Sequence, residues 1–151
     1  MKQFNVVLVL FIVLFLSACS SSESSSSQAI QSQKEFCPQC HMELDSSRIY
    51  SSSLVEDGKT LHFDDIGCMI LWAQANNIDL TGAKVFTNDT HRYIDVDKAY
   101  FKIGDKTPMS YGFGAYEHKI DNPIGFDEVT IKMLRGEHMA NPKIRKHILG
   151  Y

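Results

Sequence analysis

The chain has 151 residues, which is the length of about one domain. Its 15 lysine and arginine residues are outnumbered by 18 aspartate and glutamate residues, so the net charge is −3. This balance excludes a broad basic surface for DNA or RNA, and we expect no nucleic-acid partner. Hydrophobic residues make up 44 % of the chain, enough for a packed core, and four cysteines are too few for a disulfide-dense scaffold.

Residues 1–18 have the features of a lipoprotein signal peptide. Lys2 gives a short positive start, and residues 6–16 form an apolar run of eleven residues. That run is shorter than the roughly 20 residues that a membrane-spanning helix needs. The sequence Leu-Ser-Ala-Cys at 16–19 resembles the bacterial lipoprotein cleavage motif, so we expect Cys19 to be lipidated and to anchor the protein to a membrane. The alternative is an ordinary signal peptide in which Cys19 is incidental.

A serine-rich stretch follows the expected lipid anchor. Residues 20–27 contain seven serines and one glutamate, a composition that cannot bury apolar surface. Residues 19–35 are therefore predicted to be a flexible tether. Because no aspartate follows Cys19, we expect the outer membrane of a two-membrane bacterium, with the protein facing the periplasm, where thiols tend to oxidise.

The folded part is expected to begin near Phe36 and to have an α+β fold. In the first half, a hairpin turn at 56–59 joins two predicted strands, and Asp64 or Asp65 is a candidate helix cap. The order is strand, strand, helix and strand, over residues 48–55, 60–63, 66–76 and 83–87.

The second half begins with strand-like segments rich in aromatic and β-branched residues. These lie at residues 93–96, 99–103 and 111–116, with a loop at 107–110. A helix is predicted at 126–134 and ends near Gly136, and Asn141 with Pro142 begins a short final helix.

The strongest chemical feature is the segment Cys37-Pro38-Gln39-Cys40-His41-Met42. If residues 40–42 are extended, the Cys40 and Met42 sulfur atoms point to the same side and can bind one ion. Thiolates and thioethers are soft donors that select Cu(I) over Mg²⁺, Ca²⁺ or Mn²⁺. Zinc binds cysteine and histidine but rarely methionine, so Met42 favours copper.

Other interpretations of the Cys37–Cys40 pair remain open at this point. The pair can form a disulfide, act as a thioredoxin-like redox motif, or supply half of a structural zinc site. However, no second C-x-x-C is present. Without Cys19 three thiols remain, and because an odd number cannot pair within one chain, at least one thiolate is available for a metal.

Three further residues are weaker candidates for the same site. Cys68 is expected in the first turn of the first helix, where a helix N-terminus lowers a thiol pKa and favours a ligating thiolate. The alternative for Cys68 is a buried, inert thiol. Met109 lies in a loop and offers a second thioether, or else fills the core, and His62 offers a nitrogen or else has no role at the site.

The combination of motifs resembles the NosL family of copper-binding lipoproteins, which are associated with nitrous oxide reductase maturation. The resemblance covers roughly residues 36–116, in addition to the lipoprotein signal. The matching segments are Cys37–Met42, Phe63–Met69, Tyr93–Val96 with Ala99–Phe101, and Thr107–Tyr116. The sequence departs from the family at His41 and Ser110, positions where glycine is usual or common.

The resemblance implies a monomeric α+β fold of two small β-β-α-β units, similar to the non-catalytic part of organomercurial lyases. It implies a metallochaperone, not an enzyme, that binds Cu(I) and delivers it to apo nitrous oxide reductase for its copper–sulfide centre. Cys40 and Met42 are the best-matching ligands, Cys37 is next, and Met109 and Cys68 lie in matching motifs. The copper-binding domain is then residues 36–120, followed by a helical C-terminal extension, 121–151.

Three alternatives to this function are retained. The first is an extracytoplasmic thiol–disulfide oxidoreductase that uses Cys37 and Cys40. The second is a general copper-binding lipoprotein outside denitrification. The third, an organomercurial lyase-like enzyme, rests on fold analogy alone.

Overall fold

A computed structural model describes residues 34–151 of the protein. The expected signal peptide, the lipidation site Cys19 and nearly all of the tether lie outside the described residues. The core described below is contained in the unit Gln33–Tyr151. None of the helices in the described part of the chain is long and apolar enough to span a membrane.

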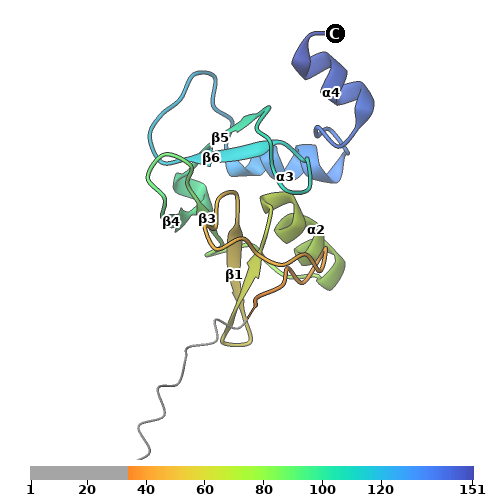
Figure 1. The fold of residues 1–151 in the computed structure, drawn as a ribbon. Coiled ribbons are helices and arrows are strands. Elements are labelled where there is room, and N and C mark those ends of the chain that lie inside the picture. The colour runs from red at the N-terminus through yellow and green to blue at the C-terminus, as the bar shows by residue number, and fades with distance from the viewer. Residues whose placement is uncertain (1–33) are drawn as a thin grey trace, which may run out of the picture. The chain divides into compact units, whose positions relative to one another are not determined.

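A four-stranded antiparallel sheet forms the first half of the fold, in the order β2-β1-β3-β4 (Figure 1). The strands are β1 (Ser52–Glu56), β2 (Lys59–Phe63), β3 (Lys84–Phe86) and β4 (Tyr93–Asp95). Asp57 and Gly58 join β1 to β2, and both have positive φ angles, 48° and 73°. Such angles suit a two-residue hairpin turn, because its twist matches that of the strands.

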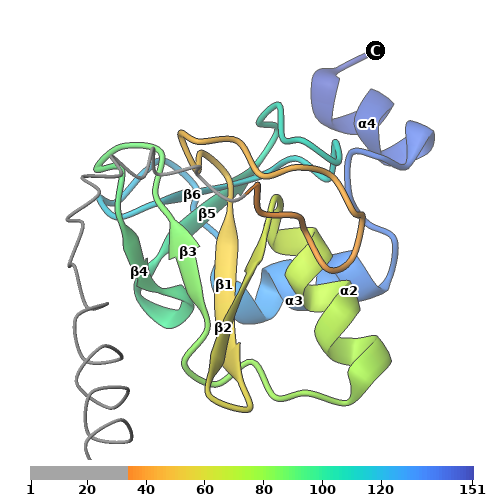
Figure 2. The same cartoon turned by 60° about the horizontal axis from the view of Figure 1, so that its bottom comes forward.

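Helix α2 (Ile66–Asn76) follows β2 directly and packs against β1 and β2 (Figure 2). The Asp65 side chain accepts a hydrogen bond from the backbone N–H of Gly67, 3.0 Å away, and so caps the helix. Asn77 adopts a left-handed conformation that ends the helix. The cap and the stop both agree with the sequence-based prediction.

The second half contains a two-stranded antiparallel sheet of β5 (Tyr100–Ile103) and β6 (Phe113–Tyr116). A short 3-10 helix, η1 (Val96–Lys98), precedes β5, and helices α3 (Phe126–Leu134) and α4 (Pro142–Leu149) follow β6. Helix α3 contacts both α2 and β5, which joins the two halves into one core. Val129 and Met133 of α3 are buried in that core with Phe101 of β5.

The mixed α+β class is confirmed, and the first half has the expected order β1-β2-α2-β3. The second half differs from the expected β-β-α-β unit. β4 pairs with β3 in the first sheet, and no strand follows α3 within residues 34–151. The reason lies in the final segment, where Pro142 at the first turn and the capping side chain of Asn141 begin a helix instead.

The packing of α3 also bears on the segment expected to be a C-terminal extension. α3 supplies buried side chains to the same core as the rest of the fold, whereas α4 buries none of its residues. Within residues 121–151, α4 is therefore the helix that projects from the core.

The start of α2 gives a direct test of this packing. A Cβ added at Gly67 would meet the Tyr111 ring at 2.3 Å and the Met133 methyl group at 2.8 Å. We expect Gly67→Ala to lower the free energy of unfolding by about 1–3 kcal/mol, because the ring of Tyr111, which packs on the core, must shift to make room for the new methyl group. Denaturant unfolding followed by circular dichroism measures this loss.

The matched control is Gly125→Ala. A Cβ at Gly125 meets no atom within 4 Å. Gly125 is the N-cap of α3, where alanine is less favourable than glycine, so we expect a loss of less than about 1 kcal/mol. Equal losses in the two variants would contradict the close packing at Gly67.

Candidate metal site

The C-x-x-C segment folds into a tight turn. The backbone N–H of Cys37 donates to the carbonyl oxygen of Met42, and the N–H of His41 donates to the carbonyl oxygen of Cys37, both at 2.9 Å. His41 has a φ of 61°, in the left-handed region. The expected extended conformation of residues 40–42 is therefore wrong, since the left-handed residue closes the turn, and strand geometry does not place the Cys40 and Met42 sulfur atoms on one side.

The second part of the site is the junction between β2 and α2. Asp64 is the residue between the end of β2 and the N-cap Asp65, and Cys68 lies in the first turn of α2. The backbone N–H of Cys68 donates to the Asp65 carbonyl oxygen at 3.0 Å, which fixes the start of the helix. Asp64 and Cys68, whose side chains can both bind a metal, are therefore held close together at the start of α2.

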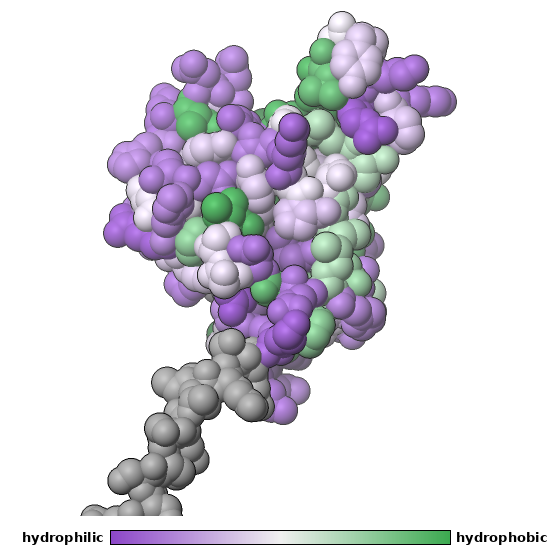
Figure 3. Space-filling model, in the orientation of Figure 1, coloured by the Kyte–Doolittle hydropathy of each residue, from purple (hydrophilic) through white to green (hydrophobic). Residues whose placement is uncertain are grey.

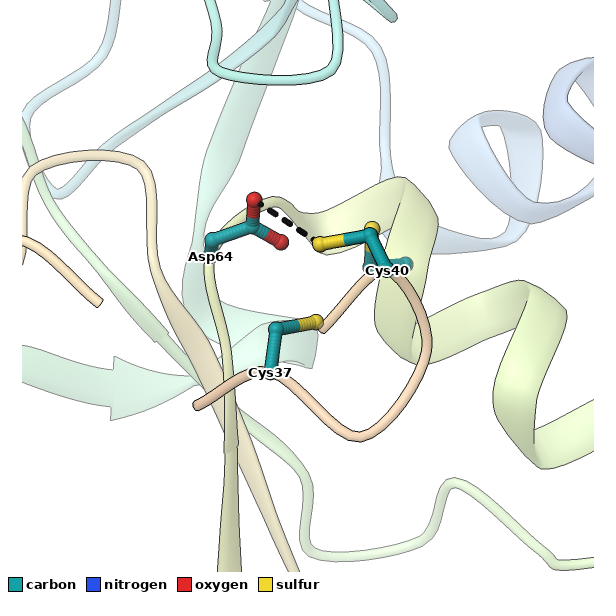
Figure 4. A group of neighbouring side chains, drawn as sticks. Cys37, Cys40 and Asp64 are labelled. Carbon is teal, nitrogen blue, oxygen red and sulfur yellow. Dashed lines mark hydrogen bonds between the residues drawn. The ribbon is translucent and has the colours of Figure 1, made fainter. Parts of the chain in front are cut away.

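These two parts meet to form a compact group of four side chains. One ligand atom from each of Cys37, Cys40, Asp64 and Cys68 lies within 4.8 Å of all the others. The Cys40 thiol donates to Oδ2 of Asp64, 3.2 Å away. Figure 4 shows this bond, with the Cys37 side chain below it. Three sulfur atoms and a carboxylate in this arrangement match the donor types of a four-ligand metal site.

Asp64 is the member of this group that the sequence reasoning missed. The pattern suggested Asp64 only as an alternative helix cap, a role that Asp65 takes. Asp64 is 5 % exposed, and its Oδ1 is buried without a hydrogen-bond partner among the described residues. A buried carboxylate oxygen without a partner is costly, and a bound cation would satisfy it. The position of Asp64 four residues before Cys68 was the available signal.

The three thiols of the group, all of them free, differ in acidity. The Cys68 thiol donates a hydrogen bond to Cys37, which lowers the pKa of Cys37 to about 6. Burial raises the pKa of Cys40 to about 12. The pKa of Cys68 is also raised, because its thiol donates to Cys37 and is buried. Of the two interpretations of Cys68, its burial agrees with that of a buried thiol, the lowering by the helix N-terminus is wrong, and the lowered pKa is that of Cys37 instead.

The remaining predicted ligands are Met42, Met109 and His62. Met42 is 45 % exposed and lines a cavity of about 250 Å³ that Asp64 also lines. The backbone N–H of Met109 donates to Oδ2 of Asp65 at 3.3 Å, which brings its loop to the start of α2. The ring of His62 is instead engaged with Tyr93, whose hydroxyl oxygen lies 3.3 Å from Nδ1. Ligation by Met42, Met109 or His62 remains a prediction.

Tyr111 forms a wall on one side of the site. Its ring packs against Gly67, next to Cys68. Burial raises the pKa of Tyr111 to about 12, and the nearby acidic groups Cys68 and Asp65 add to the effect. Tyr111 therefore stays neutral beside the group at neutral pH.

The acidity of Cys37 can be measured in the reduced, metal-free protein. Because the folded pKa lies below the ordinary thiol value of 9.0, we expect one thiolate to form as the pH rises through about 6. Ultraviolet thiolate absorbance should show this step. Cys68→Ala removes the hydrogen-bond donor, so we expect it to move the midpoint upward, and Cys37→Ser should abolish the step. An unchanged midpoint in Cys68→Ala would contradict the proposed cause.

Comparison of the chain with protein-family models, with curated proteins and with solved structures gave no match. Three cysteines and one aspartate, drawn from a tight turn and a helix start, form a group compatible with metal binding.

Proposed function

We propose that this protein is a metallochaperone that binds one Cu(I) ion through the sulfur atoms of Cys37, Cys40 and Cys68. The observation that carries the proposal is the convergence of these atoms with Asp64 within 4.8 Å. Sulfur donors favour soft, thiophilic metals, and Cu(I) is the soft ion that thiolates select most readily. Met42 supplies a thioether at the edge of the site and favours copper over zinc.

The exposure of the site favours transient binding over a structural role. Structural metal sites are closed, whereas a carrier must release its ion to another protein. Here Cys37 and Cys68 are fully buried, but Cys40 is only partly buried and Met42 is 45 % exposed. A cavity of about 250 Å³ is lined by Met42 and Asp64, and we expect a partner's ligands to approach the site from that side.

The backbone supports the resemblance to the NosL family at the two positions where the sequence departs from it. His41 and Ser110 have φ angles of 61° and 58°, in the left-handed region where glycine is favoured. Glycine is the usual or common residue of that family at these two positions. The departures therefore retain the turn that a glycine would make, at a small cost in strain.

We extend the proposal to location and client through the resemblance. The protein is lipid-anchored at Cys19, faces the periplasm from the outer membrane, and acts as a monomer. Its client is apo nitrous oxide reductase, which receives copper for its copper–sulfide centre. A carrier of copper for another envelope protein is the nearest alternative.

A thiol–disulfide oxidoreductase is less consistent with the site. In such enzymes the attacking cysteine has a lowered pKa and is accessible to its substrate. Here the cysteine with the lowered pKa, Cys37, is fully buried, while the more accessible Cys40 has a raised pKa. An insulin-reduction assay tests this alternative, and turnover without copper would favour it over metal transport.

Metal binding by the reduced protein is the first test of the proposed function. We expect one Cu(I) per chain, measured by competition with a chromogenic Cu(I) chelator. Cys37→Ser, Cys40→Ser and Cys68→Ser should each weaken binding at least tenfold, because each removes a sulfur ligand. Met42→Leu tests the predicted thioether ligand and should weaken binding with little effect on folding, since the side chain is exposed.

Asp64→Asn tests the carboxylate, and Asp45→Asn is its matched control. Both residues line the same cavity, but Asp45 is exposed and is not in the four-residue group. We expect weaker metal binding only in Asp64→Asn. The proposal would be overturned if the reduced wild-type protein bound no Cu(I). If it bound Zn²⁺ more tightly than Cu(I), the transported metal would be zinc and not copper.

Delivery is tested separately from binding. We expect Cu(I) to move from the loaded protein to apo nitrous oxide reductase, detected as copper that coelutes with the reductase after separation. A loaded Met42→Leu protein should release its ion at a different rate, because Met42 lies at the exposed edge. Retention of all copper by the carrier would exclude this client while leaving copper binding intact.

A further inference from the structure

Helix α4 is held by its own termini and not by the core. Asn141 caps it by accepting a hydrogen bond from the N–H of Lys143 at 3.1 Å, and Gly150 ends it in a left-handed conformation. None of its residues is buried. Figures 1 and 2 both show α4 at the edge of the body, away from the two sheets.

The side chains of α4 separate into two stripes. Lys143, Lys146 and His147 follow the spacing i, i+3, i+4, which places them on one face of a helix. The apolar residues Ile144 and Ile148 are spaced by four and share the opposite face. The helix is therefore amphipathic, with a basic face and an apolar face.

Two apolar side chains at the end of the chain are exposed beside the basic residues, whereas Ile144 and Ile148 are partly buried. Leu149 is 45 % exposed and Tyr151 is 77 % exposed. The projection at the upper right of Figure 3 carries hydrophobic and strongly hydrophilic side chains together. Aliphatic and tyrosine side chains beside lysine and arginine are typical of helices that lie at a membrane–water interface.

The C-terminal segment is basic, whereas the chain as a whole is acidic. Residues 138–151 contain three of the 15 lysines and arginines and none of the 18 acidic residues, while the chain has a net charge of −3. Among the ion pairs of the described residues, none involves Lys143, Arg145 or Lys146. Three cations without a protein partner are thus presented on the segment that buries nothing.

We propose that α4 and Tyr151 form a membrane-contact surface that binds the headgroups of anionic phospholipids. Charge complementarity selects this occupant: the basic side chains attract phosphate groups, while the exposed Leu149 and Tyr151 enter the headgroup region. The remainder of the chain is acidic and is repelled by the same surface, so the contact is confined to the C-terminal helix. This surface is independent of the metal site and of the expected lipid anchor.

The test uses the unit Gln33–Tyr151, which contains the whole described core and lacks the expected anchor. Its binding is measured by cosedimentation with vesicles of phosphatidylcholine alone or phosphatidylcholine mixed with phosphatidylglycerol, at low and at physiological salt. We expect at least tenfold stronger binding to the anionic vesicles, and weaker binding as salt rises. Lys143→Glu with Lys146→Glu should abolish the difference between the two vesicle types.

A charge-matched control distinguishes the contribution of α4 to vesicle binding from the effect of net charge. Lys106→Glu with Lys119→Glu changes the same number of exposed lysines elsewhere on the chain and should leave vesicle binding unchanged. Leu149→Ser with Tyr151→Ser should weaken binding even at low salt, because the apolar contact is lost.

Three outcomes would overturn the proposal. These are no binding to either vesicle, equal loss in the control variant, or concentration-dependent dimerisation that Leu149→Ser abolishes. Copper binding should be unchanged in all of these variants, because α4 supplies no ligand. A failure of copper binding in the wild-type protein would therefore leave this inference standing.

Discussion

The buried carboxylate of Asp65 is the interaction on which the rest of the site depends. Its Oδ1 accepts the N–H of Gly67 and its Oδ2 accepts the N–H of Met109, so it joins the start of α2 to the loop before β6. Burial raises its pKa to about 6, and the backbone donors oppose that shift. Since Asp64 precedes it and Cys68 follows within one turn, Asp65 sets the position of half of the metal-binding group.

The other half of the group, Cys37 and Cys40, is positioned by backbone hydrogen bonds. The turn from Cys37 to Met42 is closed by two backbone hydrogen bonds and a left-handed residue, so the two cysteines are placed by the main chain. Cys40 and Asp64 are 24 residues apart in the sequence, yet they share a hydrogen bond. Two locally ordered segments thus place the four side chains of the candidate site.

Much of the local structure could be predicted because it depends on neighbouring residues. The Asp57-Gly58 turn, the Asp65 cap, the Asn77 stop and the Asn141-Pro142 helix start all follow from short-range preferences. The partner of β4 could not be predicted in this way, because strand pairing is decided by tertiary packing.

The candidate site likewise has one part that local sequence spacing predicts and one part that depends on tertiary packing. The spacing of Cys37 and Cys40 indicated a shared role, since only two residues separate them and a turn brings both side chains to one place. Asp64 and Cys68 approach the two cysteines of the turn because the hairpin and α2 place the helix start beside that turn. No spacing in the sequence expresses the distance between these two segments. The pKa of Cys68 was predicted in the wrong direction because its hydrogen bond to Cys37 is a contact between these segments.

The uneven acidity of the three thiols has a consequence for proton balance. Near neutral pH the free group holds one thiolate, at Cys37, and two thiols, at Cys40 and Cys68. An ion that binds all three sulfur atoms as thiolates must therefore expel two protons. Its apparent affinity then changes by about a hundredfold per pH unit. Acidification therefore opposes metal binding by this group, because each proton returned to a sulfur atom competes with the ion.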